Sequence, residues 1–253
     1  NRSFHPPAMQ LEALLNYPRA LPAMPRAVTD LLGEMNKDDP SPKRVGQLIG
    51  HDPALTTRVL RLSNSAFFRV SRRIGSADEA VAMLGMTHVR SLVMAAALGA
   101  SFKNVPGVDL KQFWRYSLRV AEISKSLAGV LQQNQGNAFT AGLIHAIGVL
   151  VMHIAMPDTV APLDMATPPF DLNRAAAEKA AFGYTYADVG AGMAEKWQFP
   201  PEMVSALANQ VEPFEGEAYD RLGGILNLAS WRARAEEIHL DDQGLAATFP
   251  DMV

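Results

Sequence analysis

The chain has 253 residues, of which 48% are hydrophobic and 19% charged, and it carries a formal net charge of −3. This composition is typical of a globular domain, and it excludes a disordered or a collagen-like chain. Because the sequence contains no cysteine, it also excludes a disulfide framework, a thiolate nucleophile and a cysteine-ligated zinc or iron–sulfur centre.

Signals that start helices recur in the first half of the chain. A capping residue precedes proline at Ser41-Pro42 and at Asp52-Pro53, which is a favoured start for a helix. Ser76 and Glu79 have the spacing of a capping box. The helices expected here are Pro42–Ile49, Ala54–Ser63, a short helix from Ser76 that stops at Gly85, and one that starts at Thr87.

Apolar and amphipathic stretches continue through the second half, and no alternating run of β-branched or aromatic residues predicts a strand. Residues 157–169 are expected to form a loop or a broken helix, and residues 241–253 an irregular tail. Ala141–Met156, which His145 and His153 interrupt, falls short of the 18 apolar residues of a membrane span and predicts a buried helix. The helices expected here are Leu110–Leu131, Asn137–Met156, Asp171–Phe182, Tyr186–Trp197, Pro201–Gln210 and Ile225–Ala235. The sequence therefore predicts an all-α fold.

A polar link at Lys103–Gly107 separates two halves that differ in charge. Residues 41–103 hold nine Lys or Arg and three acidic residues, although the whole chain is negative. The arginines of this segment predict a surface for an anionic partner, and the simpler interpretation is a set of solvated helix faces. The arginines of this candidate surface are Arg58, Arg61, Arg69, Arg72 and Arg73.

Several motifs that follow one another in a fixed order carry a resemblance over roughly Leu14–Ala235. They include Ile-Gly-His-Asp-Pro-Ala-Leu-Thr at 49–56, Val-Leu-Arg-Leu-Ser-Asn-Ser-Ala-Phe at 59–67, Phe-Trp-Arg-Tyr-Ser at 113–117, Ala-Gly-Leu-Ile-His-Ala-Ile-Gly at 141–148 and Trp-Gln-Phe-Pro at 197–200. In these motifs the chain resembles the HDOD domain family of bacterial signalling modules, which is related to the HD-domain metal-dependent phosphohydrolases.

The resemblance implies a helical bundle of two packed subdomains, of which the C-terminal one is HD-domain-like. On this prediction, residues 21–103 form the N-terminal subdomain and residues 108–235 the HD-like one, together the HDOD domain 21–235. Residues 1–20 would be a lead-in helix, and residues 236–253 a C-terminal tail.

The chemistry of the HD hydrolases requires His and Asp ligands that hold one or two divalent ions. Where that family places its ligands, this chain has Tyr116, the pair His145-Ala146, Tyr186 and the pair Asn209-Gln210. Only His145 could bind a metal, and one imidazole does not supply the three or four ligands of a stable site. The comparison predicts a vestigial cleft with no catalytic residues, no metal and no cofactor.

The resemblance therefore implies a non-catalytic regulatory module of bacterial signal transduction, acting through protein–protein interaction or ligand binding. The expected partners are signalling proteins, or fused receiver or cyclic-dinucleotide domains. We expect a cytoplasmic location, no membrane association and no nucleic-acid binding.

Two alternatives stay open. A metal-dependent phosphohydrolase would need carboxylates near His145, for which Glu178 and Asp188 are candidates without a supporting motif. A nucleotide or metabolite sensor would use the vacated cleft of Tyr116, His145, Tyr186 and Gln210. Its anionic group would then meet Arg115 or Arg119.

Overall fold

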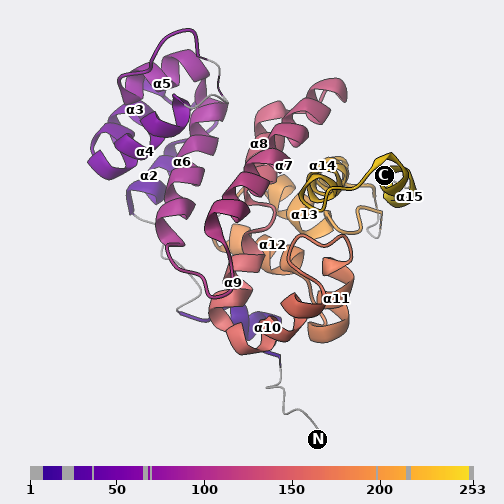
Figure 1. Ribbon diagram of the computed structural model, residues 1–253. Coiled ribbons are helices and arrows are strands. Elements are labelled where there is room, and N and C mark those ends of the chain that lie inside the picture. Colours follow the sequence, from indigo (N-terminus) through magenta and orange to yellow (C-terminus); the bar gives the residue numbers. More distant parts are fainter. Residues whose placement is uncertain are drawn as a thin grey trace, which may run out of the picture. The chain divides into compact units, whose positions relative to one another are not determined.

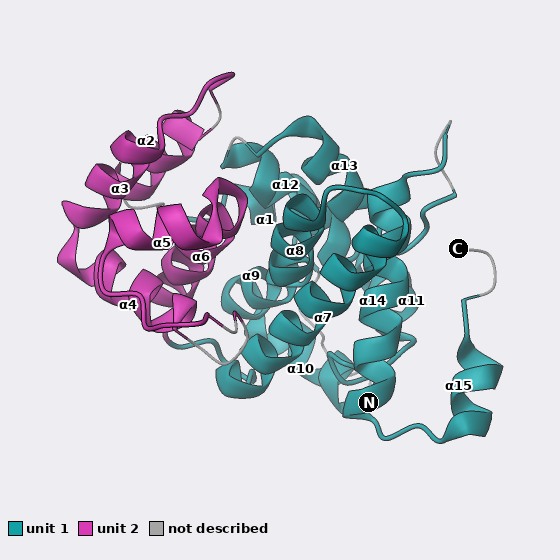
Figure 2. Ribbon diagram, turned by 90° about the horizontal axis from the view of Figure 1, so that it is seen from above, with its two compact units in different colours: residues 1–22, 104–253 teal, residues 23–103 magenta. Residues whose placement is uncertain are grey.

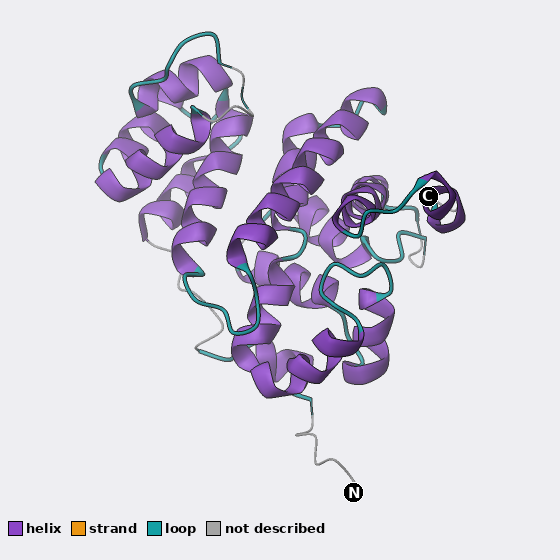
Figure 3. Ribbon diagram, in the orientation of Figure 1, coloured by secondary structure: helices purple, strands orange, loops and turns teal. Residues whose placement is uncertain are grey.

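The computed structural model describes residues 8–18, 26–35, 37–64, 68, 70–197, 199–214 and 218–250. Across these residues the regular structure is helical and contains no strand (Figure 3), which confirms the all-α prediction. The chain forms two compact units, one of residues 23–103 and the other of residues 1–22 with 104–253 (Figure 2). The unit of residues 104–253 thus also contains α1 (Leu11–Leu15), which packs against α9 (Ile147–Ala155) and α12 (Tyr186–Lys196).

Local capping explains where three helices of the unit 23–103 begin, whereas α6, which was expected to start at Thr87, begins at Met86 after Gly85 without a side-chain cap. Ser41 accepts the backbone N–H of Arg44, Asp52 accepts those of Ala54 and Leu55, and Ser76 accepts that of Glu79. Each bond satisfies a backbone donor that the first turn of a helix leaves free. The helices are α2 (Arg26–Met35), α3 (Pro42–Gly50), α4 (Pro53–Ser63), α5 (Ala77–Leu84) and α6 (Met86–Ser101) (Figure 1).

Asn64 ends α4 and bonds to the backbone of Ile74. Its side-chain amide donates to the carbonyls of Leu60 and Ile74, and its Oδ1 accepts the N–H of Ile74 at 2.8 Å. Ile74 is 1% exposed and belongs to the core of this unit. The polar residue of the Ser-Asn-Ser motif therefore has a structural role, since it joins the end of α4 to a core residue ten positions later.

In the other unit, the long helix α7 (Leu110–Val130) packs against α8 and α14, while α12 packs against α9 and α13. Buried side chains on these facing surfaces, including Phe113, Val120, Phe139, Ile144 and Leu226, form its core. The remaining helices are α8 (Gln135–Ile144), α9 (Ile147–Ala155), α10 (Pro157–Ala166), α11 (Arg174–Phe182), α12 (Tyr186–Lys196), α13 (Pro201–Asn209), α14 (Arg221–Glu237) and α15 (Asp242–Thr248) (Figure 1).

The prediction of one helix over Asn137–Met156 is wrong, because the chain breaks into α8 and α9 at His145 and Ala146. The His145 ring bonds to the carbonyl of Gly142, and the carbonyl of His145 accepts from Gln210 instead of from the next helical turn. The stretch Gln135–Ala155 is long and apolar enough to cross a membrane, yet 89% of its most apolar window is buried within the fold. That burial is the property of a core segment.

Helices occur in residues 157–169, which were expected to form a loop or a broken helix, and in the tail 241–253, which was expected to be irregular. Residues 157–166 form α10 even though Pro162 lies inside it. Proline has no N–H, so the carbonyl of Asp158, four residues earlier, receives no helical hydrogen bond. Asp158 is exposed in the first turn of α10, where water can bond to this carbonyl instead. The tail contains α15, which has no buried residue and is started by Asp241 as N-cap. A cap alone, without an apolar face, gives little periodicity for a sequence pattern to detect.

Candidate functional site

A chain of hydrogen bonds runs through the buried centre of the unit 104–253. Arg234 Nε of α14 donates to Tyr116 Oη of α7 at 3.1 Å. Tyr116 Oη in turn lies 3.0 Å from His145 Nε2, and His145 Nδ1 lies 2.7 Å from the carbonyl of Gly142. All three side chains are at most 5% exposed. We call this chain, from Arg234 to Gly142, the relay.

The partners of His145 determine its protonation. A carbonyl only accepts, so Nδ1 carries the proton that is donated to Gly142, and Nε2 accepts from the Tyr116 hydroxyl. Burial lowers the pKa of His145 to about 3, helped by the charge of Arg234 and opposed by the bond to Gly142. His145 is therefore neutral at physiological pH, and its remaining lone pair is occupied by Tyr116.

This neutral histidine predicts a loss of stability in mild acid. The unfolded chain binds a proton at His145 near pH 6.5, whereas the folded chain does so only near pH 3. Because its pKa is lower in the folded state, neutral His145 stabilises the fold above pH 6.5, and this contribution is lost as the pH falls toward 3. Between pH 7 and 5 the loss from this one group is about 2 kcal/mol.

The measurement is chemical denaturation of wild type and of His145→Gln at pH 7, 6 and 5, with probes in the unit 104–253. The variant, which has no ring to protonate, should lose less stability over this range than wild type. His239→Asn, at an exposed imidazole in the same unit, is the control and should follow wild type. Equal pH dependence of wild type and His145→Gln would contradict the assignment of a neutral His145.

The donor set at His145 does not fit the metal centre of the HD hydrolases. Both ring nitrogens of His145 are engaged, Ala146 offers no ligand atom, and Tyr116 and Tyr186 stand at the positions where the motif resemblance implies histidines. Burial raises the pKa of Tyr116, and it raises that of Tyr186 to about 12, so neither supplies a phenolate at neutral pH. Within the described residues, no group of three His, Asp or Glu side chains is placed to hold a metal ion.

The structure brings some of the predicted cleft residues together and places others elsewhere. Gln210 reaches the relay, because its Nε2 donates to the carbonyl of His145 at 3.0 Å. Tyr186 lies beneath the guanidinium of Arg234, which is 5.2 Å from the ring centroid. Asn209, by contrast, donates to Ser205 and Asp220, away from the relay.

The carboxylates considered for a hydrolase have structural partners instead. Asp188 closes a capping box with Thr185 at the start of α12. Glu178 is fully buried, where it pairs with Arg174 at 2.7 Å and accepts the backbone N–H of Tyr186 at 2.6 Å. Neither carboxylate bonds to His145.

Arg174 is the centre of a second buried polar network. Besides Glu178, it binds Asp164 at 2.6 Å, and Asp164 also contacts His153 Nε2 at 2.8 Å. Burial opposes ionisation of Asp164, but the hydrogen bonds from His153 and Arg174 outweigh it and lower its pKa. His153 thus belongs to this network, and His145 belongs to the relay.

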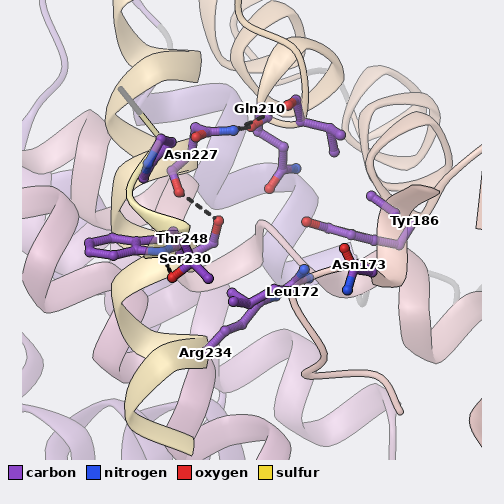
Figure 4. Close-up of a pocket in the computed structure, with 12 residues that line it drawn as sticks. Leu172, Asn173, Tyr186, Gln210, Asn227, Ser230, Arg234 and Thr248 are labelled. Carbon is purple, nitrogen blue, oxygen red and sulfur yellow. Dashed lines mark hydrogen bonds between the residues drawn. The ribbon is translucent and has the colours of Figure 1, made fainter. Parts of the chain in front are cut away.

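A pocket of about 390 Å³ opens beside the relay. Gln210 at the end of α13, Tyr186 of α12 and Arg234 of α14 converge on it, as Figure 4 shows. Trp231 and Thr248 lie on its lining and are joined by a hydrogen bond of 3.1 Å from the indole N–H. The pocket lies within the unit 104–253.

Sequence reasoning missed Arg234 and named Arg115 and Arg119 instead. Those two arginines pair with Glu237 and Glu236, and their side chains are 64% and 47% exposed. A signal for Arg234 was available in α14, since Asn227, Ser230 and Arg234 recur at the spacing of one helix face. All three line the pocket.

The candidate anionic-partner surface is only partly available. Arg58 and Arg61 are exposed three residues apart on α4, and Arg73 is exposed in the segment before α5. Arg72 pairs with Glu79 at 2.6 Å, and Arg69 lies outside the described residues. The partner of this surface stays a prediction.

The described residues define an all-α domain whose larger unit holds a buried hydrogen-bond relay beside a pocket. The chain belongs to the HDOD domain family, whose model matches residues 21–213. Its similarity to a proposed phosphohydrolase from Shewanella amazonensis SB2B covers 95% of this chain and 87% of that one, with 34% identity and a TM-score of 0.81.

Two further relatives show the fold and the length of similar proteins. An HDOD domain protein of unknown function from Geobacter sulfurreducens superposes with a TM-score of 0.71 at 22% identity, over 93% of this chain and 82% of that one. An uncharacterized protein of Treponema pallidum (strain Nichols) is 24% identical over 194 residues, which are 74% of this chain and 37% of that protein. The chain thus spans about a third of the length of this curated relative.

Proposed function

We propose that this chain is a non-catalytic regulatory module of bacterial signal transduction. The observation that carries the proposal is the relay, because it uses both nitrogens of His145 for hydrogen bonds within the protein. A metal at this position would have to replace the Tyr116 hydroxyl, and it would find Ala146 where a carboxylate is needed. Glu178 and Asp188, the carboxylates considered as substitute metal ligands, are bonded to Arg174 and to Thr185 instead.

The relatives support a regulatory role. One structural relative with 22% identity, from Marinobacter aquaeolei VT8, is described as a proposed signal transduction protein. This chain covers 58% of that protein and 37% of the Treponema relative, so similar modules occur within longer chains. We infer that the domain works with a fused or separate signalling domain in the cytoplasm and binds its partner without chemical turnover.

The test combines metal analysis with an assay of turnover. Protein purified without chelator should contain no stoichiometric divalent metal. It should not hydrolyse bis(4-nitrophenyl) phosphate with added Mn²⁺ or Mg²⁺. One or two tightly bound ions per chain, or a turnover that His145→Ala abolishes, would overturn the proposal. An HD hydrolase with an intact ligand set, assayed in parallel, shows that the conditions support the chemistry.

A further inference from the structure

The pocket beside the relay has one charged lining residue, the cation Arg234, and no acidic residue among the described residues that line it. Arg234 is 5% exposed. Its Nε donates to Tyr116 and its Nη1 to the carbonyl of Asp171 at 3.2 Å, and the Tyr186 hydroxyl is a further hydrogen-bond partner, which together engage fewer than the five N–H groups of a guanidinium. The nearby Glu178 is already paired with Arg174 at 2.7 Å. The guanidinium therefore gives the pocket a positive charge and has donor capacity to spare.

Gln210 supplies a second unsatisfied group on the same pocket. Its Nε2 donates to the carbonyls of His145 and Leu207 at 3.0 and 2.9 Å. Gln210 is only 1% exposed, and its buried Oε1 has no hydrogen-bond partner among the described residues. A buried carbonyl oxygen without a donor is costly and rare in native proteins. A molecule in the pocket that carries an N–H or O–H group would remove this cost.

The remaining lining residues suit the apolar part of a small organic molecule. The rings of Tyr186 and Trp231 line the pocket, and Thr248 and Pro250 from the C-terminal segment complete it. Aromatic walls with a few converging polar groups are typical of small-molecule sites, and a volume of about 390 Å³ is within their range.

We propose that this pocket binds a small organic carboxylate that also carries an N–H or O–H donor. The carboxylate pairs with Arg234, and the donor bonds to Oε1 of Gln210. One buried guanidinium balances one negative charge, so a carboxylate suits the pocket better than a phosphate monoester, whose second charge would be buried without a partner. The inference rests on the proposed function, since it requires that the cleft carry no metal charge.

The test uses three matched probes on the wild-type chain. The first, 4-hydroxybenzoate, has the anion and the donor; benzoate lacks the donor, and 4-hydroxybenzamide lacks the charge. Binding is followed by titration calorimetry and by the NMR signal of the Trp231 indole N–H. We expect 4-hydroxybenzoate to bind at least about ten-fold more tightly than either analogue. No binding up to about 10 mM, or equal binding of the amide, would overturn the inference.

Two variants locate the bound probe. Arg234→Met, which keeps most of the side-chain volume, should weaken 4-hydroxybenzoate at least about ten-fold. Arg119→Met, at an exposed arginine that also contacts α14, should bind as wild type does. If both variants bind equally, the site is not at Arg234 and the inference fails. Should Arg234→Met fail to fold, the comparison of the three probes on the wild-type chain decides.

A fourth probe separates this inference from the proposed function. 4-Nitrophenyl phosphate should bind more weakly than 4-hydroxybenzoate and remain intact. Its hydrolysis, with 4-hydroxybenzoate still bound selectively, would overturn the proposed function and leave the carboxylate site standing. Failure of 4-hydroxybenzoate to bind, with no hydrolysis, would overturn the carboxylate site and leave the proposed function standing.

Discussion

Gly148→Ala should prevent the unit of residues 104–253 from reaching its native packing. Gly148 lies in α9 where this helix crosses α12, and a Cβ atom there would overlap the carbonyl oxygen of Tyr186 and lie 2.9 Å from the backbone nitrogen of Gly190. Both obstacles are main-chain atoms of a buried helix, so no side-chain rotation relieves the overlap. Overpacking that side chains can absorb costs about 1–3 kcal/mol, and here we expect at least about 3 kcal/mol.

Gly190→Ala is the matched control on the opposite side of the same crossing. A Cβ atom at Gly190 would meet its nearest neighbour, the nitrogen of Gly148, at 3.7 Å, which is an ordinary contact. Alanine also favours a helix over glycine by about 1 kcal/mol. Thermal unfolding and near-ultraviolet circular dichroism should show wild-type packing for Gly190→Ala and its loss for Gly148→Ala. Native-like unfolding of Gly148→Ala would refute the main-chain overlap as a packing constraint.

Local sequence signals predicted the features of the fold that depend on neighbouring residues. The capping residues Ser41, Asp52 and Ser76 start helices as expected, because each side chain bonds to a backbone N–H two or three positions later. The all-α class follows from the same signals repeated along the chain. The break at His145 was not predictable in this way, because it depends on Gln210, 65 residues further along the chain.

The site shows the same division between local and long-range information. Motif comparison selected Tyr116 and His145, and the structure joins them by a hydrogen bond across two helices. It also selected Asn209, which faces Asp220 instead, because adjacent residues on a helix point in different directions. Arg234 was missed because the charge of a residue does not reveal its burial, and long arginine side chains are ordinarily exposed.

Removing the cation of the second buried network should destabilise the fold strongly. Arg174 is fully buried and pairs with Glu178, which is also fully buried, and with Asp164. Arg174→Met leaves the Glu178 carboxylate in the core with only the N–H of Tyr186 as a donor. Loss of one partner of a buried ion pair costs about 3–5 kcal/mol, which for a unit of this size lowers Tm by about 10 °C.

The reason for this loss can be tested by removing the stranded charge. Burial raises the pKa of Glu178, and Arg174 opposes that rise. Without Arg174, the folded state holds the Glu178 proton at a pH where the unfolded chain has released it. Glu178 then stabilises the fold at a pH below its ordinary pKa of 4.5, and this contribution is lost as the pH rises toward the pKa of the folded state. The deficit of Arg174→Met relative to wild type should therefore be smaller at pH 5 than at pH 7.5.

The double variant Arg174→Met/Glu178→Gln completes the experiment. Glutamine keeps an oxygen for the N–H of Tyr186 but carries no charge, so the double variant should be more stable at pH 7.5 than Arg174→Met alone. Because it has no group to titrate at position 178, the double variant should also lose less stability than Arg174→Met between pH 5 and 7.5. Denaturation curves of wild type, both single variants and the double variant give the coupling between the two side chains. If the double variant were as unstable as Arg174→Met, the cause would be the lost volume and the lost bonds of Arg174, and not the unpaired carboxylate.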